Sequence, residues 1–280
     1  MTTAFVLSGG GSLGSVQAGM VLALTERGIY PDLLVGTSVG AVNAGWLAGH
    51  PGPDGAAELA RVWRSIRRRD IFPTDLRGGL LGFAGRSDHL VSPRGLRSVL
   101  RRHLTFGRLE DATIPMLVVA TDITTGEELV LTRGDAIDAI AASAAIPGVF
   151  PPVMIDGRPL VDGAVANNVP IAHAVDHGAT KIYVLPTGYA CALTHSPRTA
   201  LGVALQALTL LLAQGLARDV ERYESDVELV VLPPLCPLEV SPVDFSQSDD
   251  LIERARVTSG EWLDTSHRML PHAVLGLHRH

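Results

Sequence analysis

Short apolar runs alternate along the chain with longer segments whose apolar residues recur at helical spacing. The run at 4–7 is followed by Ser8 and three glycines, and residues 15–27 then carry apolar side chains every three or four positions. A second run at 33–35 leads in the same way into an alanine- and leucine-rich segment that reaches about residue 48. Short buried strands that alternate with covering helices form parallel sheets, so the first fifty residues predict an α/β fold with a mainly parallel sheet.

The same alternation continues to about residue 270. It predicts further strands at 116–122, 128–132, 181–185 and 227–232, and a hairpin at 153–161 around Asp156-Gly157. It predicts further helices at 51–69, 93–103, 136–145, 170–177, 198–223 and 248–270. Because no repeat or linker separates these elements, we expect one domain over 1–280, with the elements of 198–270 packed on a core of residues 4–185.

Composition excludes several classes of protein. Apolar residues make up 46% and charged residues 19%, which suits a buried core, and the net charge of −6 argues against a generally basic nucleic-acid binder. Two cysteines, Cys191 and Cys236, are too few for a disulfide framework and are typical of free thiols in a reducing compartment, although one bridge stays open. The N-terminus lacks a basic region, and the apolar stretch 200–216 is short for a membrane span. We therefore expect a cytoplasmic protein without a transmembrane segment.

A possible nucleophile lies at the end of the second strand. Residues 36–40 read Gly-Thr-Ser-Val-Gly, a G-x-S-x-G pattern between a strand and a helix. In that context Ser38 occupies a tight turn, and Gly36 and Gly40 relieve the crowding that its side chain would cause. The hydroxyl is then exposed at a helix N-terminus, as a nucleophile requires. The alternative is an ordinary strand–helix turn in which Ser38 caps the helix.

The glycine-rich stretch 9–14 follows the first strand. Consecutive glycines allow several backbone N–H groups to point at one anion, either a pyrophosphate or a developing oxyanion. G-x-G-x-x-G fits here too, but a dinucleotide site needs an acid after the second strand, and Asp32 precedes that strand. The sequence therefore favours an oxyanion hole. Its candidate donors are the N–H groups of Gly9, Gly10, Gly11, Gly14 and Val39.

A third motif, Asp162-Gly163-Ala164, supplies a possible base. Together with GGGSLG at 9–14, GTSVG at 36–40 and the stretch from Ala142 to Pro147, it resembles the patatin-like phospholipase family. The resemblance covers about residues 4–185. It implies a three-layer α/β/α sandwich and a catalytic dyad of Ser38 and Asp162 without a histidine. Leu13 departs from the family, many members of which have Arg or Lys at that position.

On this interpretation Ser38 attacks an ester carbonyl while Asp162 accepts its proton. A carboxylate with the ordinary pKa of ~3.9 is a weak base for a hydroxyl, so we expect a partly buried Asp162 with a raised pKa. The expected substrate is a phospholipid, a lysophospholipid or another acyl ester, with no cofactor and no metal. Two alternatives stay open: a non-catalytic module that binds lipid or a partner, and an acyltransferase that uses the same serine.

A histidine-containing triad is the chemical alternative to the dyad. Its candidate histidines are His173, His177, His195, His267 and His272. The first two lie four residues apart on a predicted helix, a spacing that also fits two metal ligands or a solvated helix face.

Three less specific sequence features concern contact with lipid. The stretch 78–83, GGLLGF, fits a lid or an ordinary surface loop. The apolar helix 200–216 fits the core or a dimer face. Arginines could form a patch for anionic headgroups at a membrane surface, or merely solvated helix faces. They are Arg64, Arg67, Arg68, Arg69, Arg97, Arg101 and Arg102.

Overall fold

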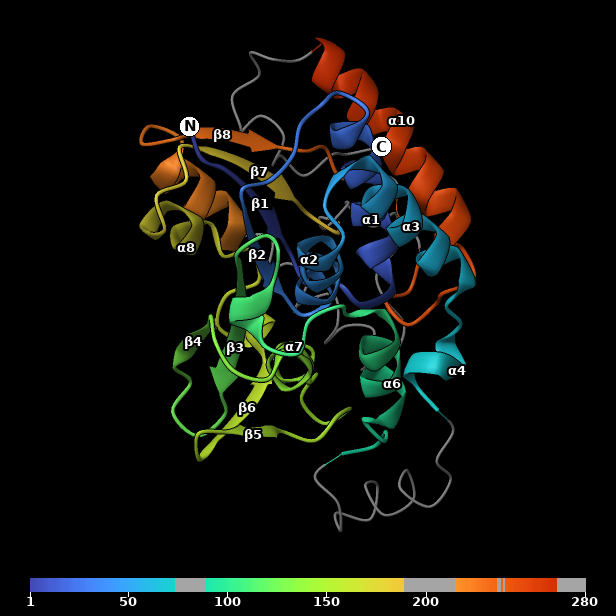
Figure 1. The fold of residues 1–280 in the computed structure, drawn as a ribbon, viewed down its shortest axis with the longest axis vertical. Coiled ribbons are helices and arrows are strands. Elements are labelled where there is room, and N and C mark those ends of the chain that lie inside the picture. The colour runs from blue at the N-terminus through green and yellow to red at the C-terminus, as the bar shows by residue number, and fades with distance from the viewer. Residues whose placement is uncertain (74–88, 189–214, 236–237, 239, 266–280) are drawn as a thin grey trace, which may run out of the picture.

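The computed structural model describes residues 1–73, 89–188, 215–235, 238 and 240–265 (Figure 1). Within these residues one eight-stranded sheet has the order β5-β6-β3-β2-β1-β7-β8, with β4 paired to β3. The parallel strands are β1 (Thr3–Leu7), β2 (Leu33–Thr37), β3 (Met116–Asp122), β7 (Lys181–Leu185) and β8 (Glu228–Val231). Antiparallel pairings involve β4 (Glu128–Leu131), β5 (Val153–Ile155) and β6 (Arg158–Asp162). The predicted α/β class and mainly parallel sheet are confirmed.

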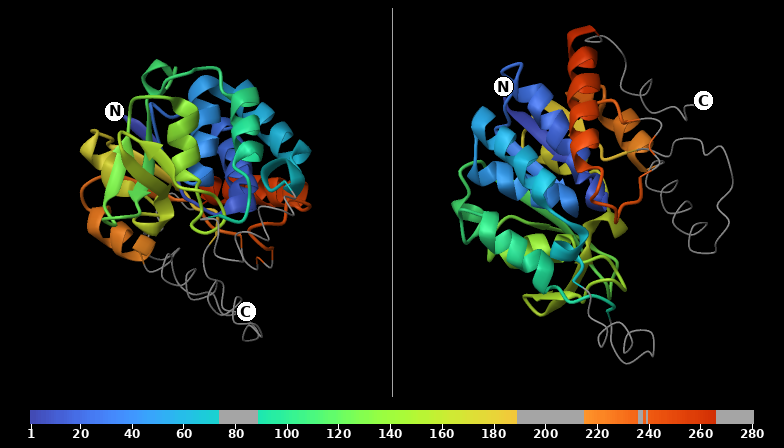
Figure 2. Two further views of the ribbon diagram at one scale, coloured as in Figure 1. Left: turned by 90° about the horizontal axis from the view of Figure 1, so that it is seen from below. Right: turned by 90° about the vertical axis from the view of Figure 1, so that its right-hand side faces the viewer.

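Helices cover both faces of the sheet (Figures 1 and 2). One face carries α1 (Gly14–Thr25), α2 (Val39–Gly49), α3 (Gly52–Ser65), α6 (Arg94–His103), α7 (Ala136–Ser143) and α10 (Ser248–Thr265). The other face carries α8 (Ile171–Asp176) and a helix at 215–223. Single turns of 3₁₀ helix are η1 (Gly11–Leu13), η2 (Leu109–Asp111) and η3 (Gly163–Val165). The expected three-layer arrangement is therefore present.

Strand β1 shows why its sequence is apolar without alternation. Phe5 and Leu7 are buried in the core under α1 and α2, whereas Ala4 and Val6 are buried in the core under α8. Side chains of a strand point to opposite faces in turn, so a strand covered on both faces needs apolar residues at every position.

The prediction of one continuous helix over 51–69 is wrong, because the structure has two helices there. Helix α3 ends at Ser65, and a short α4 (Arg68–Ile71) follows after two residues in extended conformation. The Asp70 carboxylate accepts the backbone N–H of Arg67 at 2.8 Å, which caps a new helix start. The extended backbone also places the side chain of Ile66 in the core.

Several expectations fall outside the described residues. They concern the stretch 78–83, both cysteines, the first part of the predicted helix 198–223 and the last residues of the helix 248–270. The single-domain organisation accordingly stays a prediction. Among the helices that the structure describes, none has the length and apolar character to cross a membrane.

Candidate active site

The register of the sheet brings two of the sequence motifs together. Strand β2 pairs with β3 up to Thr37 opposite Val119, and β6 pairs with β3 from Asp162 opposite Ala120. Strands β2 and β6 must pair with the same edge of β3, because β4 occupies the other edge over residues 118–121. The ends of β2 and β6 therefore meet at neighbouring positions of β3. The residue that follows β2, Ser38, lies beside the last residue of β6.

Ser38 and Asp162 form a buried hydrogen-bonded pair. The Ser38 hydroxyl donates to Asp162 Oδ2 at 2.6 Å, and the backbone N–H of Ala164 donates to Asp162 Oδ1 at 2.9 Å. Only 6% of Ser38 and 4% of Asp162 are exposed. Burial raises the pKa of Asp162 to about 6, although the two hydrogen bonds favour its charged form and oppose the rise. The direction agrees with the expected rise in pKa, but Asp162 is fully and not partly buried.

The backbone at Ser38 is strained. Its φ of 56° and ψ of −124° lie outside the backbone conformations that residues other than glycine prefer. The N–H of Ser38 donates to the Ser143 hydroxyl on α7 at 2.8 Å, which holds the turn in this conformation. No side-chain bond from Ser38 caps α2. Ser38 is the N-cap residue of α2 by position, but the alternative in which its side chain caps the helix is wrong.

The flanking glycines allow backbone segments to approach each other. A Cβ on Gly40 would lie 2.1 Å from the carbonyl oxygen of Leu7, at the end of β1. A Cβ on Gly36 would lie 2.6 Å from the carbonyl oxygen of Gly40, and one on Gly163 would lie 2.2 Å from that of Val119. Backbone atoms, and not the Ser38 side chain, are therefore the nearest neighbours of these positions. Gly36 and Gly40 make room for the first turn of α2 against the sheet, and Gly163 makes room for η3 against β3.

Two of the five expected oxyanion donors are already engaged within the protein. Gly9 donates its N–H to the Asn168 side chain at 3.1 Å, and Gly14 donates to carbonyl oxygens of η1. Both glycines instead permit close packing. A Cβ on Gly9 would lie 3.1 Å from Cβ of Ser38, and one on Gly14 would lie 2.4 Å from the Val39 side chain.

The other three donors are available. The N–H groups of Gly10, Gly11 and Val39 make no hydrogen bond to any residue of the described ranges. Val39 begins α2, whose first N–H groups lack partners within the helix and carry its positive dipole end. The geometry therefore favours Gly10, Gly11 and Val39 over Gly9 and Gly14.

Residues far along the chain fix the glycine loop. The Thr187 hydroxyl donates to the carbonyl oxygen of Gly9 at 2.6 Å. Ser12 donates its N–H to the Pro242 carbonyl at 2.8 Å and its hydroxyl to the Ser241 carbonyl at 3.1 Å. Sequence reasoning missed these contacts, as it missed Ser143 and Asn168, because nothing in the local pattern marks them. For Ser143 the only signal is its place in the stretch 142–147.

A network of buried, hydrogen-bonded polar side chains supports the start of α1. Gln17 donates to the carbonyl oxygens of Ser8 and Leu185, each at 2.9 Å. Asn43 donates to Gln17 Oε1 at 2.8 Å, and the Trp63 indole N–H donates to Asn43 Oδ1 at 2.8 Å. Every member therefore has a partner, as buried polar groups require. This network links α1, α2 and α3 to the ends of β1 and β7.

The two described candidate histidines, His173 and His177, make no hydrogen bond to Ser38 or Asp162. His173 makes a hydrogen bond with Glu128, with 2.6 Å between Nε2 and Oε1, and the His177 ring makes one with the His173 carbonyl oxygen. His195, His267 and His272 lie outside the described residues. Within the part of the chain that the structure describes, no three metal-binding side chains cluster.

The structure also shows where Asp32, Leu13 and the candidate arginines lie. The Asp32 carboxylate accepts the N–H of Thr3 at 2.8 Å, so it lies at the opposite end of β1 from the glycine loop and does not complete a dinucleotide site. Leu13 is buried, and it brings no cation to the loop. Two of the seven arginines form ion pairs with acidic side chains: Arg64 with Asp249 and Arg97 with Asp138, each at 2.6 Å. These ion pairs engage two of the seven arginines, and the headgroup patch stays a prediction.

The fold and the site define an α/β protein with a strained serine at a strand–helix turn and a buried aspartate hydrogen-bonded to it. The sequence model of the family described as patatin-like phospholipase matches residues 5–175, and the chain belongs to this family.

The chain is similar to parts of longer proteins. Lysophospholipase NTE1 of Mycosarcoma maydis is 29% identical over 67% of this chain and 10% of its own length. The mouse patatin-like phospholipase domain-containing protein 7 is 29% identical over 66% of this chain and 13% of its own length. Among solved structures, VipD from Legionella pneumophila matches with a TM-score of 0.49 at 14% identity, over 94% of this chain and 67% of that one. The chain thus spans about a tenth of the length of these curated relatives.

Proposed function

We propose that the chain is a serine hydrolase that cleaves acyl esters of lipids, with Ser38 as the nucleophile and Asp162 as the base. The observation that carries this proposal is the 2.6 Å hydrogen bond between Ser38 Oγ and a buried carboxylate whose pKa is raised to about 6. A carboxylate of that pKa is largely ionised at pH 7 and is a stronger base than an ordinary aspartate.

The reaction would proceed through an acyl-enzyme. Ser38 Oγ attacks the ester carbonyl carbon as its proton passes to Asp162, and the resulting oxyanion accepts hydrogen bonds from Gly10, Gly11 and Val39. The intermediate collapses, and the leaving alcohol takes the proton from Asp162. A water then attacks the acyl group and gives its proton to Asp162, which returns it to Ser38 as the fatty acid leaves.

Lysophospholipid is the first substrate to test. Membership of the patatin-like phospholipase family supports a lipid, and the name of one relative, lysophospholipase NTE1, supports a single acyl chain with a headgroup. The site would be reached from an aggregate of lipid, so contact with a membrane surface belongs to the proposal.

The test is reaction of the purified protein with a fluorophosphonate probe and with lysophosphatidylcholine. Ser38→Ala and Asp162→Asn should lose both labelling and fatty-acid release. Ser259→Ala is the matched control, because Ser259 is buried in α10 and its hydroxyl has no partner among the described residues. Labelling that survives in Ser38→Ala would show that another serine reacts. A folded wild-type protein that is never labelled would favour the non-catalytic binding module, and transfer of the acyl group to an added alcohol would favour the acyltransferase.

A further inference from the structure

The glycine loop after β1 lies between the residues that follow the two neighbouring strands. Strand β1 pairs with β2 along one edge and with β7 along the other, each in parallel. Ser38 follows β2 directly, and Thr187 lies two residues beyond the end of β7. A Cβ on Gly9 would lie 3.1 Å from Cβ of Ser38, and a Cβ on Gly10 would lie 2.1 Å from Oγ1 of Thr187. The peptide that joins the two glycines therefore has the candidate nucleophile on one side and Thr187 on the other.

Thr187 holds the carbonyl group of this peptide. Its hydroxyl donates to the Gly9 carbonyl oxygen at 2.6 Å, a shorter bond than the 3.2 Å from the Ser8 hydroxyl to the same oxygen. Its backbone N–H donates to Ser8 Oγ at 2.9 Å, and only 4% of Thr187 is exposed. Glycine at position 10 permits this approach, because a Cβ there would collide with the Thr187 hydroxyl.

The hydrogen bond at the carbonyl group acts on the N–H of the same peptide. A trans peptide is planar, and its C=O and N–H groups point in opposite directions. The Gly9 carbonyl points to Thr187 on the β7 side, so the Gly10 N–H points to the β2 side, where Ser38 lies. A peptide whose carbonyl accepts a hydrogen bond is polarised, which makes its N–H a stronger donor. The Thr187 hydroxyl thus sets both the direction and the strength of one candidate oxyanion donor.

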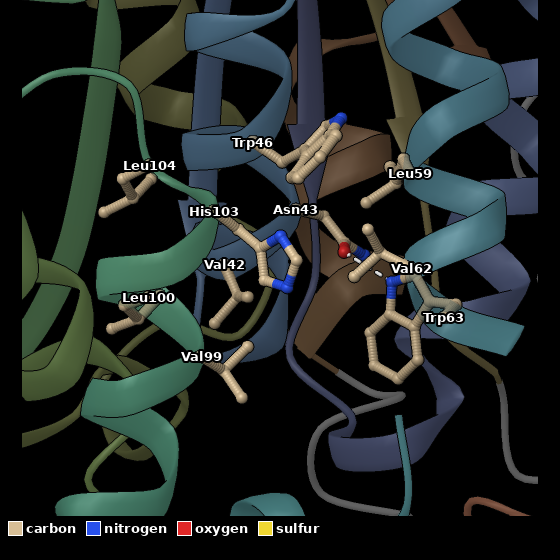
Figure 3. Close-up of a pocket in the computed structure, with 10 residues that line it drawn as sticks. All are labelled: Val42, Asn43, Trp46, Leu59, Val62, Trp63, Val99, Leu100, His103 and Leu104. Carbon is tan, nitrogen blue, oxygen red and sulfur yellow. Dashed lines mark hydrogen bonds between the residues drawn. The ribbon is translucent and has the colours of Figure 1, made fainter. Parts of the chain in front are cut away.

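Buried side chains hold the ends of β1 and β7 together next to this loop. Gln17 donates to the carbonyl oxygen of Ser8 after β1 and to that of Leu185 in β7. Figure 3 shows the far end of the same network, where the Trp63 indole N–H donates to Asn43, which in turn donates to Gln17. The distance between the glycine loop and the residues that follow β7 is therefore fixed from below the loop as well as within it.

The other two candidate donors are held by backbone groups. The carbonyl oxygen of Gly10, which shares a peptide with the Gly11 N–H, accepts the N–H of Leu13 at 3.2 Å. The carbonyl oxygen of Ser38, which shares a peptide with the Val39 N–H, accepts an N–H of the first turn of α2 at 2.9 Å. Within the described residues, the Gly10 donor is thus the one whose orientation a side-chain substitution can change.

We propose that Thr187 is a positioning residue, which orients and polarises the Gly10 N–H for the oxyanion formed at Ser38. This inference rests on the proposed ester hydrolysis. The oxyanion exists in the transition state and the tetrahedral intermediate but not in the bound ester, so loss of the Thr187 hydroxyl should slow the reaction without weakening substrate binding.

The test compares two substitutions of Thr187. Thr187→Val removes the hydroxyl and keeps the shape of the side chain, whereas Thr187→Ser keeps the hydroxyl. For p-nitrophenyl butyrate, kcat should fall at least tenfold in Thr187→Val with KM within threefold of wild type, since loss of a whole oxyanion donor costs ~10²–10³ in kcat. Thr187→Ser should restore kcat to within threefold of wild type.

Thr25→Val is the matched control. It removes another buried hydroxyl that donates to a carbonyl oxygen, that of Val21 in α1 at 2.9 Å, and it should leave kcat unchanged. A wild-type kcat in folded Thr187→Val, or a Thr187→Ser variant as slow as Thr187→Val, would overturn the proposal.

A second measurement does not depend on hydrolysis. In protein labelled with ¹³C and ¹⁵N at glycine, the NMR signals of the Gly9 carbonyl carbon and the Gly10 amide nitrogen report the hydrogen bond to their peptide. Both signals should move to lower frequency in Thr187→Val, return in Thr187→Ser and stay in place in Thr25→Val. This result would support the positioning of Gly10 even if the wild-type protein hydrolysed no ester and the proposed function failed. Signals that stay in place in Thr187→Val would refute it even in an active esterase.

Discussion

Replacement of Asp162 by asparagine should abolish activity and yet stabilise the protein at neutral pH. The raised pKa of Asp162, about 6 against an ordinary 3.8, means that the folded protein holds the charged form at a cost. One pKa unit corresponds to ~1.36 kcal/mol, so the ionised carboxylate lowers the free energy of unfolding by about 3 kcal/mol. Asparagine removes the charge and keeps an oxygen for the Ala164 N–H.

The effect has a definite pH dependence. Folded wild-type protein binds the Asp162 proton more tightly than the unfolded chain does, so its stability falls as pH rises from about 4 to about 6 and is level above that range. Asp162→Asn lacks this fall. Its stability relative to wild type should therefore rise by about 2 to 3 kcal/mol between pH 4 and pH 7.

Urea unfolding of both proteins from pH 4 to pH 8 measures this difference. Asp122→Asn is the matched control, because Asp122 is a buried carboxylate of β3 whose pKa is held well below its usual range by hydrogen bonds from Thr124 and Arg158. It should lower stability, by an amount that does not vary between pH 5 and pH 8. A difference between Asp162→Asn and wild type that changes by less than about 0.5 kcal/mol from pH 4 to pH 7 would refute the assignment of a costly buried charge.

Three further predictions concern the site. The kcat/KM for a short ester should rise with pH through about 6, the pKa of Asp162, and level above it; a profile flat from pH 5 to 8 would contradict a role for that base. Ser143→Ala removes the acceptor of the Ser38 N–H, so the free energy of unfolding in urea should fall by about 1–3 kcal/mol and labelling by the fluorophosphonate should slow. Unchanged labelling would mean that the turn keeps its conformation without this hydrogen bond. Gly40→Ala should prevent folding or labelling because its Cβ meets a backbone oxygen at 2.1 Å, whereas Gly107→Ala, with open space around it, should change Tm little. Equal Tm values for the two variants would show that α2 can shift away from the sheet.

The sequence by itself determined the local elements and the order of the motifs. Strand β1 is continuously apolar because both of its faces are buried, and the turn at 36–40 is marked by two glycines around a serine. These are short-range signals, and apolar periodicity and glycine spacing report them directly. The same signals failed at 66–67, where capping by Asp70 begins a second helix that the periodicity does not distinguish from the first.

Only the tertiary structure decided which residues meet. The pairing of Ser38 with Asp162 depends on β2 and β6 sharing one edge of β3, a register that joins residues 124 positions apart. The choice among the glycine donors depends on Asn168, which engages the N–H of Gly9. The pKa of Asp162 depends on burial beneath elements distant in sequence. Local patterns carry no record of such contacts, because hydrogen bonding and desolvation at a site are set by whatever the folded chain packs against it.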